Sequence, residues 1–164
     1  MASGWTGDSE YESLLREHGA SLVRFALLLT GNRFDAEDIV HDAIIAVAAR
    51  WSGIPKTAPY AYLRKAVARR AIDLARRRRP VVGVVPESAV EDGGYLRLEE
   101  DAAFLARLAG LPSRQRAVLV LRYQQDLDDR TIGRILGCTA STVRSQAARA
   151  LASLKKAMGE GHGS

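Results

Sequence analysis

Apolar residues recur at three- and four-residue steps along nearly the whole chain, which is the period of an α-helix buried on one side. The first such segment covers residues 11–29, and the turn residues Thr30, Gly31 and Asn32 then break the pattern. Asp35 is placed to cap the next predicted helix, which runs to about residue 51. The chain therefore begins with two helices joined by a tight turn.

A loop, a third helix and a linker follow. One glycine and two prolines predict a loop over residues 52–59, and the helical period returns from about residue 60 to residue 79, before Pro80. Residues 81–98 are a predicted flexible linker, because glycines, prolines and acids replace the apolar pattern there. The valines of residues 81–85 could instead form a short strand or an extended segment lying on a partner.

The second half is helical again. Its periodicity predicts helices over about residues 98–109, 113–123 and 126–136, and a last helix capped by Thr139. Gly137 is placed where a helix ends in the left-handed conformation. A short helix, a three-residue turn with glycine and a longer helix give the spacing of a helix-turn-helix. The fold class expected is all-α: two small helical bundles joined by a flexible linker, the second containing a helix-turn-helix.

Length and composition agree with this picture. A chain of 164 residues suits two small helical domains, and its one cysteine, Cys138, excludes an internal disulfide. No apolar run approaches the length of a membrane span, and the polar N-terminus has no secretory signal pattern. We therefore expect a cytoplasmic protein with no membrane partner.

The distribution of charge indicates a polyanionic partner more clearly than the net charge of +5. Residues 60–80 carry eight basic residues and one acid, a net of +7, and residues 111–158 carry nine and three, a net of +6. Between them, residues 86–101 carry six acids and one base, a net of −5. Two basic segments separated by an acidic stretch are typical of two contacts with nucleic acid.

The arginines of the third predicted helix lack matching acids. Such a helix repels itself, so a polyanion is its natural neutraliser. The alternative is a solvated helix end whose last arginines complement the helix dipole, which accounts for only two or three of them. The unmatched residues are Arg69, Arg70, Arg76, Arg77, Arg78 and Arg79.

The start of the last predicted helix is a second candidate DNA-binding surface. Short hydroxyl side chains allow close approach to phosphates, and arginine can pair with the edge of guanine. The alternative is a helical hairpin with a solvated basic face. The residues opposite the apolar side are Ser141, Thr142, Arg144, Ser145 and Arg149.

The second predicted helix has an acidic face. Asp38 and Asp42 lie four residues apart and repel each other unless a basic group is near. Glu37 and His41 share that spacing, so a metal or acid–base site of Glu37, His41 and Asp42 is an alternative. Such a site needs more ligands, and the chain has no phosphate-binding loop, nucleophile elbow or Cys/His metal spacing. No metal, cofactor or enzymatic activity is expected.

Taken together and in order, these motifs resemble the extracytoplasmic-function sigma factors of bacterial RNA polymerase. The residues similar to the core domain of that family are 29–31, 35–42, 61–63 and 72–73, with the arginine run. The residues similar to its promoter-reading domain are 111–116, 119–123, 136–138 and 142–145. The resemblance covers roughly residues 9–80 and 99–157. The departures from the usual family pattern include Arg70, Thr131, Ser141 and the His41-Asp42 pair.

The resemblance implies a factor that binds core RNA polymerase and directs it to promoter DNA. Residues 9–80 would form region 2, which docks on the polymerase clamp and opens the −10 element. Residues 81–98 would form the linker, and residues 99–158 would form region 4, which binds the −35 element and the polymerase flap. An anti-sigma protein is a further partner that such factors can have.

The same resemblance assigns roles to residues. The loop before the third helix is where such factors capture a flipped −10 base, although from its residues alone it is equally an ordinary connector. Polymerase binding would fall to Glu37, Asp38 and Asp42. Contacts with −10 DNA would fall to Lys56, Thr57, Tyr60, Arg64, Arg69, Arg70, Arg76 and Arg77. Contacts with −35 DNA would fall to Ser141, Thr142, Arg144, Ser145 and Arg149.

The competing function is a DNA-binding regulator that acts on an operator without polymerase. Such a regulator would normally carry a dimerisation or ligand domain in its first half. Here the first half has an arginine-rich helix and an acidic face instead. Copurification with core polymerase separates the two hypotheses.

Overall fold

The computed structural model describes residues 3–55, 58–77 and 98–162, and within these ranges the chain is helical, with no strand. The prediction of an all-α fold is confirmed. The predicted linker lies outside the described residues, apart from Leu98, where a helix begins. Lys56 and Thr57 also lie outside them.

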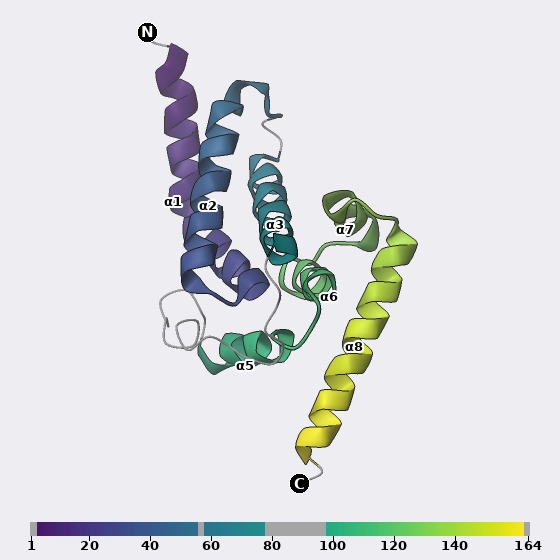
Figure 1. Ribbon diagram of the computed structural model, residues 1–164. Coiled ribbons are helices and arrows are strands. Elements are labelled where there is room, and N and C mark those ends of the chain that lie inside the picture. Colours follow the sequence, from purple (N-terminus) through teal and green to yellow (C-terminus); the bar gives the residue numbers. More distant parts are fainter. Residues whose placement is uncertain (1–2, 56–57, 78–97, 163–164) are drawn as a thin grey trace.

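The first bundle is made of three helices that all pack against one another (Figure 1). They are α1 (Ser3–Thr30), α2 (Arg33–Ala49) and α3 (Pro59–Arg77), with a single 3-10 turn, η1 (Trp51–Gly53), after α2. Each helix buries its apolar side, and residues such as Phe25, Ala43 and Leu63 are fully buried. Burial of that surface is the main force that holds the bundle together.

The turn between α1 and α2 shows how the chain reverses. Gly31 has a φ of 68°, and its N–H donates to the carbonyl oxygen of Leu27 at 2.8 Å. The side chain of Asn32 caps α2 by accepting from the backbone N–H of Asp35 at 3.1 Å. The prediction that Asp35 is this cap is therefore wrong: Asp35 lies in the first turn, where its charge suits the helix dipole.

The second bundle contains shorter helices and one long one. They are α5 (Leu98–Leu108), α6 (Ser113–Leu119), the π-helical turn η2 (Val120–Gln124), α7 (Asp129–Leu136) and α8 (Ala140–His162). The helix predicted over residues 113–123 is thus α6 continued by η2. Both α6 and α7 pack on the first part of α8, and the rest of α8 extends away from them towards the C-terminus (Figure 1).

The predicted helix-turn-helix is present as α7, a tight turn and α8. Asp128 caps α7 by accepting from the N–H of Thr131 at 2.8 Å, and Gly137 ends it with a φ of 73°. Thr139 caps α8 as predicted, because its Oγ1 accepts from the N–H of Thr142 at 3.1 Å. The turn passes so close to α7 that a Cβ on Gly133 would lie 2.5 Å from the carbonyl oxygen of Cys138.

The two bundles pack together, because α3 contacts α6 and α7 while α1 contacts α6 and η2. The end of α1 is consequently buried on every side, and even the adjacent residues Leu27 and Leu28 have no exposed surface. Arg116 of α6 joins the bundles by donating to the carbonyl oxygen of Leu29 at 3.3 Å. It also donates to the last carbonyls of α5, at Leu108 and Ala109, both at 3.0 Å. One hydrophobic core therefore runs through both halves.

Candidate nucleic-acid and partner interfaces

A groove between α2, η1 and α3 is a candidate site in the described part of the chain. Its volume is about 940 Å³. Small residues such as Ala46, Gly53 and Ala66 line it and leave room for a ligand. We call it the α2–α3 groove; its polar and aromatic lining residues are Arg50, Ser52, Tyr62, Lys65, Arg69 and Arg70.

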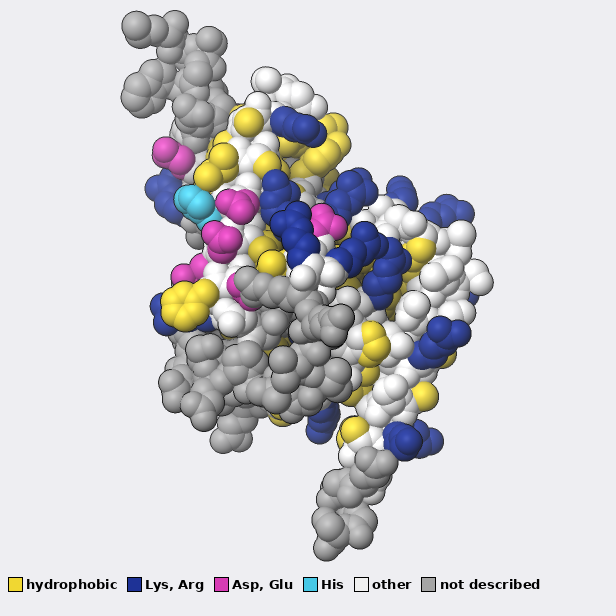
Figure 2. All heavy atoms as spheres, in the orientation of Figure 1, with side chains coloured by type: hydrophobic (Ala, Val, Ile, Leu, Met, Phe, Trp, Pro, Cys, Tyr) yellow, Lys and Arg dark blue, Asp and Glu magenta, His cyan; other side chains and the backbone are white. Residues whose placement is uncertain are grey.

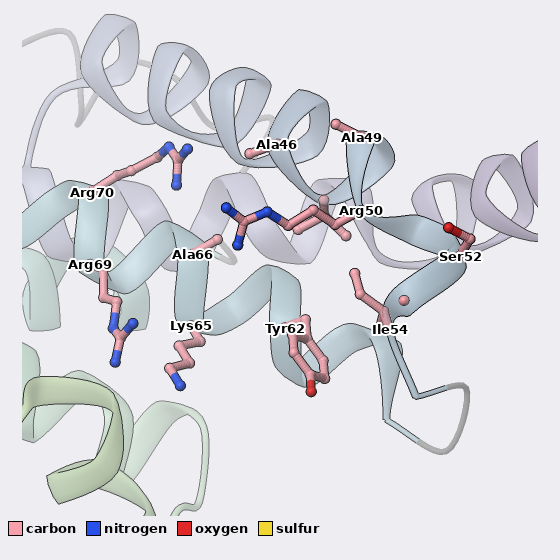
Figure 3. A pocket seen from close by; sticks show the side chains of 12 residues that line it. Ala46, Ala49, Arg50, Ser52, Ile54, Tyr62, Lys65, Ala66, Arg69 and Arg70 are labelled. Atoms are coloured by element: carbon pink, nitrogen blue, oxygen red, sulfur yellow. The ribbon is translucent and has the colours of Figure 1, made fainter.

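The side chains of the α2–α3 groove suit a single nucleic-acid strand. Arg50 lies across the space between α2 and α3, while Tyr62, Lys65 and Arg69 follow one another along α3 (Figure 3). Cationic groups can pair with successive phosphates, and an exposed tyrosine ring offers a base a stacking surface. Tyr62 is 42% exposed, which leaves its ring available. The groove therefore combines charge, an aromatic face and space.

The structure separates the residues expected at the −10 element into three groups. Arg69 and Arg70 line the α2–α3 groove. Arg76 and Arg77 are exposed at the end of α3, in its last turn. Tyr60 and Arg64 are only half-exposed and do not line the groove.

Tyr60 lies at the junction between the bundles, and Arg64 lies over its ring. The Tyr60 ring stacks on His18 of α1, with centroids 4.6 Å apart, and its hydroxyl hydrogen-bonds the side chain of Gln125. The guanidinium of Arg64 lies 5.6 Å from the centre of that ring. Burial raises the pKa of Tyr60, although Arg64 and Gln125 oppose the shift, and burial lowers the pKa of Arg64. Both side chains are already engaged within the protein.

Two of the four cations that line the groove were not predicted from the sequence. Arg50 ends α2 and Lys65 lies within the basic run, yet neither was expected to contact DNA. Lys65 could have been found, because it lies four residues before Arg69 and so shares its helix face. Arg50 could not, because its place beside α3 depends on how α2 and α3 cross.

The acidic face of α2 is exposed, as predicted. Neither Asp38 nor Asp42 forms an ion pair within the described residues. Glu37 differs, because its carboxylate accepts from Nε of Arg33 at 3.0 Å. Two large apolar side chains flank the acids on the same helix: Phe34 is 71% exposed and Ile45 is 54% exposed. An acidic centre with apolar flanks has the chemistry that suits a basic protein partner.

The alternative metal site at Glu37, His41 and Asp42 finds no geometric support. No group of three His, Cys, Asp or Glu side chains in the described residues is arranged to hold a metal ion. Glu37 is turned to Arg33, while His41 and Asp42 face solvent. His18, another histidine of the first bundle, is half-buried against Tyr60.

The residues predicted to form the recognition surface lie on the exposed side of α8. Val143, Ala147 and Ala150 have no exposed surface and anchor the helix to α6 and α7. The five residues expected at the −35 element are all exposed: Ser141, Thr142, Arg144, Ser145 and Arg149. Thr142 is partly engaged, because its hydroxyl lies 3.0 Å from that of Thr139. The others are available to a ligand.

Charge is segregated over the face drawn in Figure 2. Acidic side chains gather over the first two helices, and basic side chains spread from α3 across the second bundle (Figure 2). One face therefore presents surfaces for two partners of opposite charge. Among the described helices, none is long and apolar enough to cross a membrane.

Two family models match the chain. Residues 14–81 match Sigma-70 region 2, and residues 101–154 match Sigma-70, region 4. The first match contains the acidic face and the α2–α3 groove, and the second contains the helix-turn-helix.

Relatives extend these matches to nearly the full chain. An RNA polymerase sigma-E factor of Streptomyces avermitilis is 30% identical over 151 residues, which cover 90% of this chain and 84% of the relative. The ECF RNA polymerase sigma factor SigM of Mycobacterium tuberculosis is 30% identical over 167 residues, covering 97% and 83%.

Solved structures share the fold. A structure of CnrH in complex with the cytosolic domain of CnrY has a TM-score of 0.68 and 21% identity, covering 97% of this chain and 94% of that one. A structure of the sigma factor RpoE in complex with the anti-sigma factor NepR from Bartonella quintana has the same TM-score and identity, covering 90% and 95%. At this identity the likeness concerns the fold alone.

Proposed function

The chain belongs to the extracytoplasmic-function sigma factors of RNA polymerase, and from this premise we propose that its α2–α3 groove holds the non-template strand of the −10 element. A sigma factor binds core RNA polymerase and directs promoter-specific initiation of transcription. The remaining question is which surfaces of this chain perform each step. The observation that carries the proposal is the groove itself, with its four cations and one exposed tyrosine.

Holding an unpaired strand has an energetic cost that the groove must offset. Extruding a base from the duplex costs a few kcal/mol. Stacking on an aromatic ring contributes roughly 1–3 kcal/mol per base, and each phosphate contact adds to it. Tyr62 with Arg50 and Lys65 supplies both kinds of interaction within one space of about 940 Å³. Together these contacts are of the size that strand capture requires.

We assign the remaining surfaces in the same way. Asp38 and Asp42, between the exposed apolar residues Phe34 and Ile45, form the docking surface for core polymerase. The exposed side of α8 reads the −35 element. We assign region 2 to residues 9–80, the linker to residues 81–98 and region 4 to residues 99–158. The family matches at residues 14–81 and 101–154 support this division.

Two further assignments follow from the family. An anti-sigma protein is a proposed partner, supported by the likeness to two sigma factors whose structures are complexes with CnrY and NepR. The cytoplasm is the proposed location, because core polymerase and promoter DNA are there. As in other sigma factors, we expect no catalytic step to fall to this chain.

The test of the groove is strand opening by the reconstituted holoenzyme. Arg50→Ala with Lys65→Ala should leave polymerase binding intact and reduce permanganate reactivity of −10 thymines on duplex promoters by about tenfold or more. A template already mismatched across the −10 region should restore part of the transcription, because the cost of unpairing has been removed.

The matched control removes two exposed arginines elsewhere, with Arg16→Ala and Arg107→Ala. This control should open promoters as the wild type does. Equal footprints from the groove variant and the wild type would exclude the groove as the strand-binding site.

A further inference from the structure

Arg69 lies at a boundary between two sites. It lines the α2–α3 groove on one side, and on the other it lines a smaller cavity of about 230 Å³ between α3, α6 and α7. Its Nε donates to the carbonyl oxygen of Ile135 at 3.3 Å, and its Nη2 donates to that of Arg134 at 3.5 Å. A groove cation is therefore bound to the helix-turn-helix of the other bundle.

The carbonyls that Arg69 binds belong to the last turn of α7 (Asp129–Leu136). Carbonyls there lack helical partners and carry the negative end of the helix dipole, so a guanidinium is a favourable partner for them. Both bonds are longer than an ordinary N–H···O hydrogen bond, and Arg69 remains exposed to solvent. This contact is favourable but readily exchanged for another anionic partner.

A second polar contact between the bundles can also be broken easily. Tyr60, at the start of α3, is joined to the second bundle by the Gln125 side chain, and both residues are only half-buried. Arg116 differs, because three carbonyls satisfy it and burial lowers its pKa. The junction thus combines one firmly held arginine with two contacts that can open without leaving a deeply buried group unpaired.

We propose that Arg69 is a latch: in the free chain α7 holds it, and a DNA strand entering the α2–α3 groove competes for it. The inference rests on the proposed function of the groove. A phosphate is a stronger acceptor for guanidinium than a pair of neutral carbonyls, so the strand wins once it is in place. Binding of the −10 strand would then loosen α7 from α3. In the free chain, the apparent affinity for the strand would be reduced to the share set by the fraction of molecules whose junction is open.

The latch can be measured in the free chain, without DNA. Spin labels at Ala48→Cys on α2 and Arg130→Cys on α7, in a Cys138→Ser background, report the separation of the bundles from two exposed positions. The wild type should give one narrow distance distribution, and Arg69→Ala should broaden it at least twofold. Arg70→Ala is the matched control, because Arg70 lines only the groove, and it should leave the distribution narrow.

The competition between α7 and the DNA strand for Arg69 is tested at Gln125, a junction residue that does not line the groove. Gln125→Ala should bind a fluorescent single-stranded −10 oligonucleotide about threefold more tightly than the wild type, because a larger share of molecules is open. Gln146→Ala on α8 is the control and should not change this affinity. Tighter binding by a variant that adds no DNA contact is a result that a merely structural role of Gln125 would not produce.

Each outcome decides a separate question. Identical distance distributions for Arg69→Ala and the wild type would overturn the latch, and unchanged oligonucleotide affinity in Gln125→Ala would overturn the competition. If no form of the chain bound the oligonucleotide, the proposed function of the groove would fail, while the distance measurement would still decide whether Arg69 holds α7.

Discussion

A charged side chain is available to a partner only if it is not already paired within the protein. Glu37 is paired with Arg33, whereas Asp38 and Asp42 have no ion pair in the described part of the chain. Two carboxylates one turn apart repel each other, and a basic partner relieves that repulsion. The docking role that we propose for α2 therefore rests on Asp38 and Asp42 rather than on the three acids expected from the sequence.

Charge reversal tests this docking surface. Asp38→Arg with Asp42→Arg should weaken binding to core polymerase by at least about tenfold at moderate salt, because both charges would then repel a basic partner. Circular dichroism should show unchanged helix content, since neither side chain is buried. The paired control is Glu12→Arg with Glu17→Arg, two exposed acids of α1. Undiminished copurification of the α2 variant with polymerase would remove this surface from consideration.

Gly133 shows a residue whose importance the sequence did not reveal. Its place within α7 looks like an ordinary weak point of a helix, yet a Cβ there would lie 2.5 Å from the backbone of Cys138. We expect Gly133→Ala to destabilise the fold by about 1–3 kcal/mol, because backbone must shift to admit the methyl group. Urea unfolding measures this value.

Gly19 provides the opposite case for comparison. It also lies within a helix, but a Cβ there would meet nothing within 4 Å. Gly19→Ala should therefore stabilise the fold by roughly 0.5–1 kcal/mol, the usual helix preference of alanine. Equal effects of the two substitutions would mean that the turn does not approach α7 as closely as described.

At the scale of elements, helix ends decide where the recognition helix lies. Periodicity located α7 and α8, and the cap at Thr139 is confirmed. The cap of α2 was predicted wrongly, because Asp35 and Asn32 are both good capping residues and only the backbone path selects between them. The π-helical turn η2 was also not predicted, because the helical period of residues 113–123 does not distinguish a π-helical turn from an α-helical one.

The cap of α7 gives a pH-dependent prediction. Hydrogen bonds from Thr131, and more weakly the charges of Arg134 and Arg130, hold the pKa of Asp128 below its usual value of 3.8. The stabilising effect of the carboxylate is therefore complete above the unfolded pKa and disappears as pH falls through the lower folded pKa. Asp128→Asn keeps a capping acceptor and should lose part of this acid sensitivity while remaining stable at neutral pH.

Asp128→Ala removes the acceptor altogether and should lower the thermal midpoint at every pH. The comparison is made by thermal unfolding of the three proteins between neutral pH and the acid limit of the folded state. A wild-type protein with the same acid dependence as Asp128→Asn would show that this cap does not contribute to stability through its charge.

The exposed side of α8 gives the prediction for the −35 element. We expect Arg144 to contact a phosphate of the DNA backbone, so Arg144→Ala should weaken binding to matched and mismatched −35 duplexes alike. It should also reduce the dependence of the affinity on salt concentration by about the amount that one phosphate contact contributes. Lys156→Ala, on the part of α8 beyond α6 and α7, is the control. Loss of roughly 1–3 kcal/mol on the matched duplex alone would instead assign a base contact to Arg144.

At the scale of the whole molecule, the sequence predicts each bundle but not how the two pack. The buried side of each helix follows from its periodicity, yet nothing in the pattern says that α6 and η2 cover the end of α1. The joining contacts of Arg69 and Arg116 go to backbone carbonyls, which carry no sequence signature. The sequence likewise did not show that Tyr60 lies beside Gln125 of the second bundle, with Arg64 over its ring; their contacts with −10 DNA remain a prediction.

The most direct test of the central claim is run-off transcription with purified core polymerase on a library of promoter templates. We predict that adding the chain yields transcripts from a subset of templates, each with one preferred sequence near −35 and one near −10. Arg50→Ala with Lys65→Ala should lose the transcripts from duplex templates. No transcription beyond that of core polymerase alone, together with duplex binding by the free chain, would contradict the account and indicate a regulator that acts on an operator by itself.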